Sequence, residues 1–199
     1  MLLHYLALGD SYTIGEAVPA AGRWPAQLVV RLRERGVAID DPQIVAVTGW
    51  TTDELSSAMD AASFAPPYGL VTLLIGVNNQ YRGRDAGEYR DEFARLLRRA
   101  VGLAGGHASR VVVVSIPDWG VTRFAREQGR DPAQIAQALD AYNAIARDET
   151  GRAGARWVDI TPISRRHPEL VAEDGLHPSA QQYALWTEAI LPVAAAAVK

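Results

Sequence analysis

Two short segments near opposite ends of the chain carry the residue types of a nucleophile and its base. Ser11 lies in residues 9–13 (GDSYT), whereas Asp174 and His177 lie three residues apart in residues 174–178 (DGLHP). A serine hydroxyl is a poor nucleophile at neutral pH, so it needs an imidazole to take its proton and a carboxylate to orient that imidazole. Either segment alone is also typical of an ordinary turn or helix cap. The two segments together predict catalysis by Ser11, with His177 as the base and Asp174 as its carboxylate.

Two residues between these segments have the properties needed to stabilise an oxyanion. Acyl transfer from an ester passes through a tetrahedral intermediate, so hydrogen-bond donors must point to the place where its negative charge develops. Gly49, in residues 47–50 (VTGW), lets the backbone approach a ligand closely, and Asn78, in residues 76–79 (GVNN), offers an amide NH2 group. With the main-chain amide of Ser11, they supply three candidate donors.

The elements that must position these residues follow a β-α alternation. Short runs rich in Val, Leu and Ile predict buried parallel strands, and amphipathic segments between them predict helices that cover both faces of a sheet. Helix starts are expected at Thr51, Asp85, Asp131 and Ser179; the first, second and fourth fit capping boxes, and Asp131 precedes a first-turn proline. The fold class is therefore α/β, a three-layer α/β/α sandwich. The five expected strands are residues 4–8, 43–47, 70–75, 110–116 and 156–160.

A parallel sheet places its ligands at the carboxyl ends of its strands. Ser11 follows the first expected strand, Gly49 the second, Asn78 the third, and residues 117–120 (PDWG) the fourth. The segment that holds His177 follows the fifth strand after a longer connection. We therefore expect all five loops to converge on one edge of the sheet.

In their order and spacing, these segments resemble the four sequence blocks of the SGNH, or GDSL, hydrolase family, from residue 9 to residue 177. The resemblance implies a flavodoxin-like sandwich with a five-stranded parallel sheet and an esterase, lipase or thioesterase activity. It assigns the nucleophile to Ser11 and the oxyanion hole to the Ser11 amide, Gly49 and Asn78. The triad is completed by Asp174 and His177. Many members have Asp after the asparagine of the third block, whereas this chain has Asn79.

Other residues near the expected site are candidates for binding the substrate or for bracing the Ser11 turn. Trp50, Asn79 and Trp119 are candidates for a substrate pocket, although aromatic side chains also seek burial. Asp10 is expected to brace the Ser11 turn, because side chains adjacent in sequence usually diverge. Three arginines could bind an anionic group of a substrate, or lie solvated on the surface: Arg82, Arg123 and Arg126.

Three other histidines could compete with His177 as the base. His4 falls in an expected strand, and His107 lies in a glycine-rich turn. His167 also precedes a proline, but no carboxylate stands three residues before it. We interpret His167 as a solvated loop residue.

Composition limits the alternatives. The 199 residues include 48% hydrophobic and 22% charged residues, which is typical of a globular protein that closes one core, so we expect one domain over residues 1–199. A net charge of -3 and the lack of a basic run give no reason to expect nucleic acid. No apolar segment reaches the ~18 residues of a membrane span, and no leader is evident, so a cytoplasmic location is expected. Zero cysteines exclude disulfides and thiolate metal sites.

The most direct function is hydrolysis of a carboxylic ester, with short or soluble acyl groups favoured by the lack of a long apolar lid segment. The same family includes lysophospholipases, thioesterases and carbohydrate acetylesterases, so these alternatives stay open, as does a transferase relative. A flavodoxin-like module that holds a phosphate on the Ser11 turn would leave Asn78, Asp174 and His177 without a role. We expect a small-molecule ester as the partner, no cofactor and no metal. The sequence does not indicate an oligomeric state.

Overall fold

Five parallel strands form the middle layer of the fold, in the order β2-β1-β3-β4-β5. The computed structural model describes residues 2–199. The ends of each strand agree with the range expected from the sequence to within two residues, so the α/β/α sandwich with its five-stranded parallel sheet is confirmed. The strands are β1 (Tyr5–Gly9), β2 (Gln43–Ala46), β3 (Leu70–Leu74), β4 (Val111–Val114) and β5 (Arg156–Val158).

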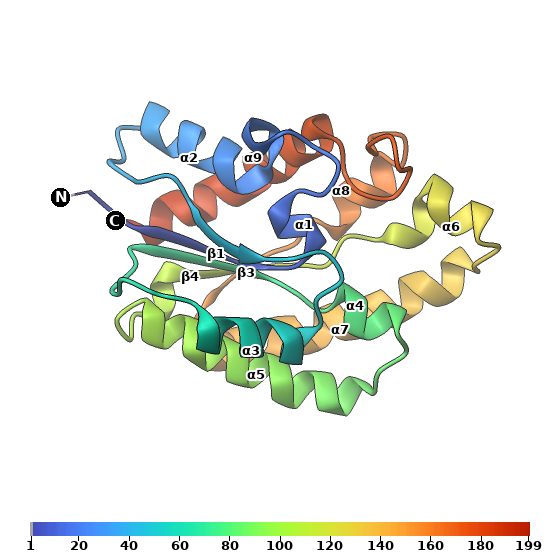
Figure 1. Ribbon diagram of the computed structural model, residues 1–199, viewed down its shortest axis with the longest axis horizontal. Helices are drawn as coiled ribbons and strands as arrows, with labels where there is room; N and C mark the ends of the chain where they lie inside the picture. The colour runs from blue at the N-terminus through green and yellow to red at the C-terminus, as the bar shows by residue number, and fades with distance from the viewer. Residues whose placement is uncertain (1) are drawn as a thin grey trace.

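Helices cover both faces of this sheet (Figure 1). One outer layer contains α2 (Trp24–Glu34) and α9 (Ala180–Ala197), which pack on each other, and the opposite layer contains α3 (Thr52–Ala61), α5 (Ala86–Leu103) and α7 (Pro132–Ala153). The remaining helices are short: α1 (Ser11–Ile14), η1 (Ala20–Gly22), α4 (Val77–Tyr81), η2 (Ala108–Arg110), η3 (Trp119–Val121), α6 (Arg123–Glu127) and α8 (Thr161–Arg166). Among the described residues, no helix has the length and apolar character to cross a membrane.

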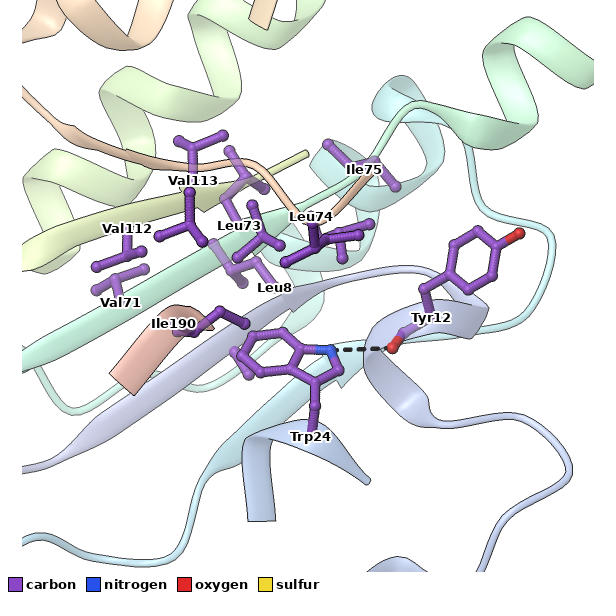
Figure 2. Packing of buried hydrophobic residues seen from close by; sticks show 14 of the residues in the cluster. Leu8, Tyr12, Trp24, Val71, Leu73, Leu74, Ile75, Val112, Val113 and Ile190 are labelled. Atoms are coloured by element: carbon purple, nitrogen blue, oxygen red, sulfur yellow. Dashed lines mark hydrogen bonds between the residues drawn. The ribbon is translucent and has the colours of Figure 1, made fainter. Parts of the chain in front are cut away.

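The core lies where the helices bury the faces of the central strands (Figure 2). All residues of β1, β3 and β4 are buried, as expected for strands covered on both sides. Trp24, also fully buried, begins α2, and its indole Nε1 donates a hydrogen bond of 3.0 Å to the main-chain oxygen of Tyr12. The core packing therefore fixes the first turn after β1 directly.

The four expected helix caps are present, but of the three expected capping boxes only the one at Thr51 is complete; at Asp85, within residues 2–199, the Glu88 side chain accepts no hydrogen bond from the cap amide. Asp85 and Asp131 accept main-chain hydrogen bonds at the starts of α5 and α7, and the Thr51 amide donates to Glu54 at 2.8 Å. Ser179 accepts from the Gln182 amide at 3.3 Å, but the Gln182 side chain donates to two carbonyls of the preceding loop instead of returning to the cap. The expected capping box at Ser179 is therefore only half formed, because this glutamine fastens the loop before α9.

The carboxyl ends of the strands meet at one edge of the sandwich, and α1, α4 and α6 gather there (Figure 1). α1 begins two residues after β1, and α4 begins three residues after β3. The loop before α9 returns to the same edge, where Tyr12 of α1 contacts the ring of His177. This arrangement brings the first and last motifs of the chain together.

Candidate active site

The turn after β1 presents Ser11 at the start of α1. Gly9 ends the strand, and a side chain there would lie 2.2 Å from Thr13 Oγ1 and 2.5 Å from the Leu74 carbonyl oxygen, so only glycine fits. Asp10 caps α1 by accepting a hydrogen bond of 3.0 Å from the Tyr12 amide. Ser11 is 5% exposed. Ser11 therefore lies on a tightly constrained turn and lines a cavity.

Asp10 does not contact His177 and instead braces this turn. The carboxyl is fully buried, and its Oδ2 has no hydrogen-bond partner within residues 2–199. Burial raises the pKa of Asp10 to about 7, although the hydrogen bond from the Tyr12 amide favours ionisation. Asp10 is therefore poorly suited to hold an imidazolium, which agrees with the bracing role expected from the sequence.

The loop before α9 pairs Asp174 with His177. Asp174 Oδ2 lies 2.7 Å from His177 Nδ1, and Asp174 Oδ1 accepts from the amides of Leu176 and His177 at 2.9 and 3.0 Å. Partial burial opposes ionisation of Asp174, but the His177 ring and these two amides outweigh it and lower the pKa of the carboxyl. A carboxylate at Nδ1 leaves Nε2 of the imidazole as the nitrogen that can take a proton.

His177 is also supported from the nucleophile turn. The ring of Tyr12 meets the imidazole edge to face, with 5.7 Å between centroids, and Tyr12 packs in the same way on Trp186 of α9. The loop itself is closed by a hydrogen bond of 2.7 Å from the Ala172 amide to the His177 carbonyl. Both motifs are thus held in one packed unit.

The two candidate oxyanion donors lie at the same edge of the sheet. Gly49 has a φ of 89°, which favours glycine, and its carbonyl accepts a hydrogen bond of 2.7 Å from Arg82. Asn78 Nδ2 donates to the Trp50 carbonyl at 2.9 Å, which orients the amide and leaves its second N–H free for a ligand. Within the described residues, neither the Ser11 amide nor the Gly49 amide donates to a protein acceptor. These groups fit the requirements of an anion site.

One cavity of about 210 Å³ collects most of the expected residues. Ser11, Gly49, Asn78 and His177 line it, and Asp174 stands behind His177. Trp119 also lines it, with its Nε1 donating to Gln80 at 2.9 Å. The rest of the lining is mainly apolar and comprises Tyr12, Thr48, Val77, Tyr81, Phe124 and Leu176.

Trp50 and Asn79, expected as pocket residues, do not line this cavity. The Trp50 side chain packs half-buried against the core, and only its carbonyl serves the site through Asn78. Asn79 is fully buried and turned toward α3, where its Oδ1 accepts from the Thr52 amide at 3.1 Å and its Nδ2 donates to Thr52 Oγ1 at 2.6 Å. Asn79 therefore positions the loop of Asn78 rather than contacting a ligand.

The three arginines considered as anion-binding residues all donate hydrogen bonds to the protein. Arg82 donates to Gly49 and Glu54, Arg123 to the Glu173 carbonyl, and Arg126 to the Val121 carbonyl.

The sequence analysis did not predict most of the apolar residues that line the cavity. The helical spacing of Tyr81 from Asn78 could have revealed one of these residues, since positions three apart share a helix face.

The structure offers no obvious place for a metal. Among the described residues, no group of three His, Cys, Asp or Glu side chains is placed to hold one. A larger surface hollow of about 770 Å³ runs along α7 and β5, but none of the expected site residues lines it. The expected nucleophile Ser11 and the expected base His177 line the smaller cavity instead.

The chain is similar to known proteins in sequence pattern and in fold. The model of the GDSL-like lipase/acylhydrolase family matches residues 7–185. No curated protein sequence matches the chain significantly. The solved structure of TesA is similar with a TM-score of 0.75, 16% identity, and coverage of 96% of this chain and 97% of that one.

Two esterase structures have similar folds. The psychrotrophic esterase EstA from Pseudoalteromonas sp. gives a TM-score of 0.73 at 14% identity, covering 96% of this chain and 95% of that one. The acetylxylan esterase Axe2 from Geobacillus stearothermophilus gives a TM-score of 0.73 at 19% identity, covering 96% of this chain and 94% of that one. At such low identity, the likeness establishes a shared fold.

Proposed function

Since the chain belongs to the GDSL-like lipase/acylhydrolase family, we propose that it hydrolyses carboxylic esters through an acyl-enzyme intermediate on Ser11. The observation that carries this proposal is the 2.7 Å contact between Asp174 Oδ2 and His177 Nδ1 on the wall of the cavity that also exposes Ser11. A carboxylate so placed fixes the imidazole tautomer and stabilises the imidazolium that forms when Ser11 loses its proton.

The proposed reaction has two halves. In the first, His177 Nε2 takes the Ser11 proton as Oγ attacks the ester carbonyl, and the same imidazolium then protonates the leaving alcohol. In the second, His177 takes a proton from water as the water attacks the acyl carbonyl, and the imidazolium then returns that proton to Ser11 Oγ as the acid leaves. In both halves the Ser11 and Gly49 amides and the Asn78 NH2 group stabilise the oxyanion.

The size and lining of the cavity support a short acyl group. About 210 Å³ is below the roughly 300–1,000 Å³ of sites that bury drug-sized ligands. Its walls are mainly aromatic and aliphatic side chains, which suit a few methylene groups. We therefore propose esters of short or soluble acids as substrates, in preference to esters or thioesters of long-chain acids.

Covalent labelling tests the nucleophile. A fluorophosphonate probe should add to wild-type protein at one site, measured by intact mass, and Ser11→Ala should prevent the addition. The absence of an adduct on well-folded wild-type protein would contradict the proposed function.

A series of p-nitrophenyl esters from acetate to palmitate tests the acyl preference. We expect kcat/KM to be highest for the short esters, because a long chain would have to leave the cavity. A clear preference for palmitate would refute this part of the proposal while leaving the Ser11 mechanism in place.

A further inference from the structure

Arg130 stands over the aromatic wall of the cavity. It lies in the loop between α6 and α7, and its guanidinium carbon is 5.5 Å from the ring centre of Trp119 and 5.6 Å from that of Tyr81. Both rings line the cavity, and they contact each other edge to face with 5.3 Å between centroids. A hydrogen bond of 3.0 Å from its main-chain amide to the Ala125 carbonyl holds the loop on α6. The cation therefore lies beside the site, exposed to solvent, without being part of the proposed catalytic machinery.

The donors of this guanidinium are free to bind a ligand. The contacts with the two rings pair the guanidinium with no oxygen acceptor, so its N–H groups remain available to a ligand. Within residues 2–199, no carboxylate forms an ion pair with Arg130, and no protein acceptor bonds to its side chain. Arg82 and Arg123, also near this edge, differ in donating hydrogen bonds to main-chain carbonyls of the protein.

We propose that Arg130 selects esters that carry a carboxylate in addition to the ester group. Such a ligand would place its reacting carbonyl at Ser11, its short apolar part against Tyr81 and Trp119, and its carboxylate on the N–H groups of Arg130. A planar guanidinium binds a planar carboxylate with two parallel hydrogen bonds, which a neutral group cannot match. This inference rests on the proposed ester hydrolysis and names a substrate class for the same cavity.

Matched pairs of substrates test the inference. On the acyl side, mono-p-nitrophenyl adipate is compared with p-nitrophenyl hexanoate; on the alcohol side, 4-acetoxybenzoate is compared with its methyl ester. Wild-type protein should prefer the anionic member of at least one pair, as measured by kcat/KM after subtraction of the uncatalysed rate. The pair that shows the preference identifies which part of the substrate reaches Arg130.

Arg130→Gln should lower the ratio of kcat/KM between the anionic and neutral members by ~10-fold or more, because a charged hydrogen bond is lost. Arg130→Lys, which keeps the charge but loses the planar fork, should give an intermediate ratio. Arg98→Gln, an exposed arginine on α5 that does not line the cavity, removes the same charge and should leave the ratio unchanged.

Two outcomes would overturn the inference while leaving ester hydrolysis intact. One is a wild-type protein that hydrolyses both members of each pair equally well. The other is an Arg130→Gln variant in which both rates change together, which would mean that Arg130 only packs on the aromatic rings. A wild-type protein that hydrolyses none of these esters and takes up no fluorophosphonate would instead remove the proposed function, and this inference with it.

Discussion

The cavity has two walls that are held in place by different means. The core wall, residues 9–15 and 76–81, is fixed from beneath by fully buried side chains, among them Asp10 and Asn79. The loop wall, residues 123–130 and 172–178, is fixed mainly by its own main chain: Phe124 donates to the Gly175 carbonyl at 3.0 Å, and Asp174 accepts from two nearby amides. Each wall contributes one half of the proposed machinery, with Ser11 on the first and His177 on the second.

This difference separates two aspartates near the expected catalytic residues: Asp10, which is next to Ser11, and Asp174, which is three residues before His177. Burial raises the pKa of Asp10 to about 7, whereas the hydrogen bonds around Asp174 lower the pKa of that carboxyl despite its partial burial. Only the loop wall therefore supplies a carboxylate that is ionised throughout the neutral range. The core wall gives rigidity, and the loop wall gives the charge that an imidazolium needs.

The largest expected effect comes from removing the base on the loop wall. We expect His177→Ala to lower kcat by ~10³-fold or more on p-nitrophenyl acetate, since Ser11 would then have no group to take its proton. His167→Ala is the matched control, because that ring is 40% exposed and lies 3.5 Å from Glu169. Equal losses in both variants, with both proteins folded by circular dichroism, would mean that His177 is not the base.

A smaller effect is expected from the oxyanion donor on the core wall. Asn78→Ala should lower kcat by ~10²-fold with little change in KM, because the amide serves the transition state more than the bound ester. Steady-state kinetics on p-nitrophenyl acetate measure both constants. A raised KM with unchanged kcat would show that Asn78 binds the ground state instead, and would leave two main-chain amides as the oxyanion hole.

The buried carboxyl of Asp10, on the core wall, should make the free energy of unfolding depend on pH. The pKa of about 7 in the folded chain exceeds the value near 4 of an ordinary aspartate, so the folded state binds this proton more tightly than the unfolded state. The contribution of Asp10 to the free energy of unfolding is therefore increasingly unfavourable as pH rises from about 4 to about 7. Asp10→Asn removes that contribution while keeping an acceptor for the Tyr12 amide.

We expect the free energy of unfolding of Asp10→Asn, relative to wild type, to increase by about 2–3 kcal/mol between pH 5 and pH 8. Any pH-independent cost of burying the new NH2 group cancels in this difference. Urea unfolding of both proteins at the two pH values measures it. A flat difference for Asp10→Asn would mean that Asp10 is ionised in the folded chain.

The core wall was also the more predictable of the two. Runs of Val, Leu and Ile predicted the strands to within two residues, and the motifs that follow β1 and β3 predicted Ser11 and Asn78 at the edge of the sheet where both line the cavity. The sequence could not give side-chain directions: Asn78 and Asn79 are successive residues of α4, about 100° apart around its axis, so only one faces the cavity. Arg130 could not be predicted, because its position depends on how a loop folds back on Trp119.

Asn79 places a neutral amide in the core wall at the position where the resemblance described above leads us to expect an aspartate. Its Nδ2 lies 3.5 Å from Glu92 Oε2, and the same carboxylate accepts a hydrogen bond from Thr52 Oγ1. An aspartate here would face Glu92 from a fully buried position, so two negative charges would compete for one hydroxyl. The amide is the residue that can donate to both neighbours.

We expect Asn79→Asp to lower the free energy of unfolding by about 1–3 kcal/mol at pH 8, through the cost of an unpaired buried charge. The loss should be smaller at pH 5, where a protonated carboxyl could donate to Glu92. Adding Glu92→Gln should recover most of the loss, because the new carboxylate then has an amide donor beside it. Urea unfolding of the single and double variants measures the coupling between the two positions. If the loss of free energy of unfolding in the double variant equals the sum of the losses in the two single variants, Glu92 does not explain the preference for an amide at position 79. The Asn78 loop would then be held by Thr52 alone.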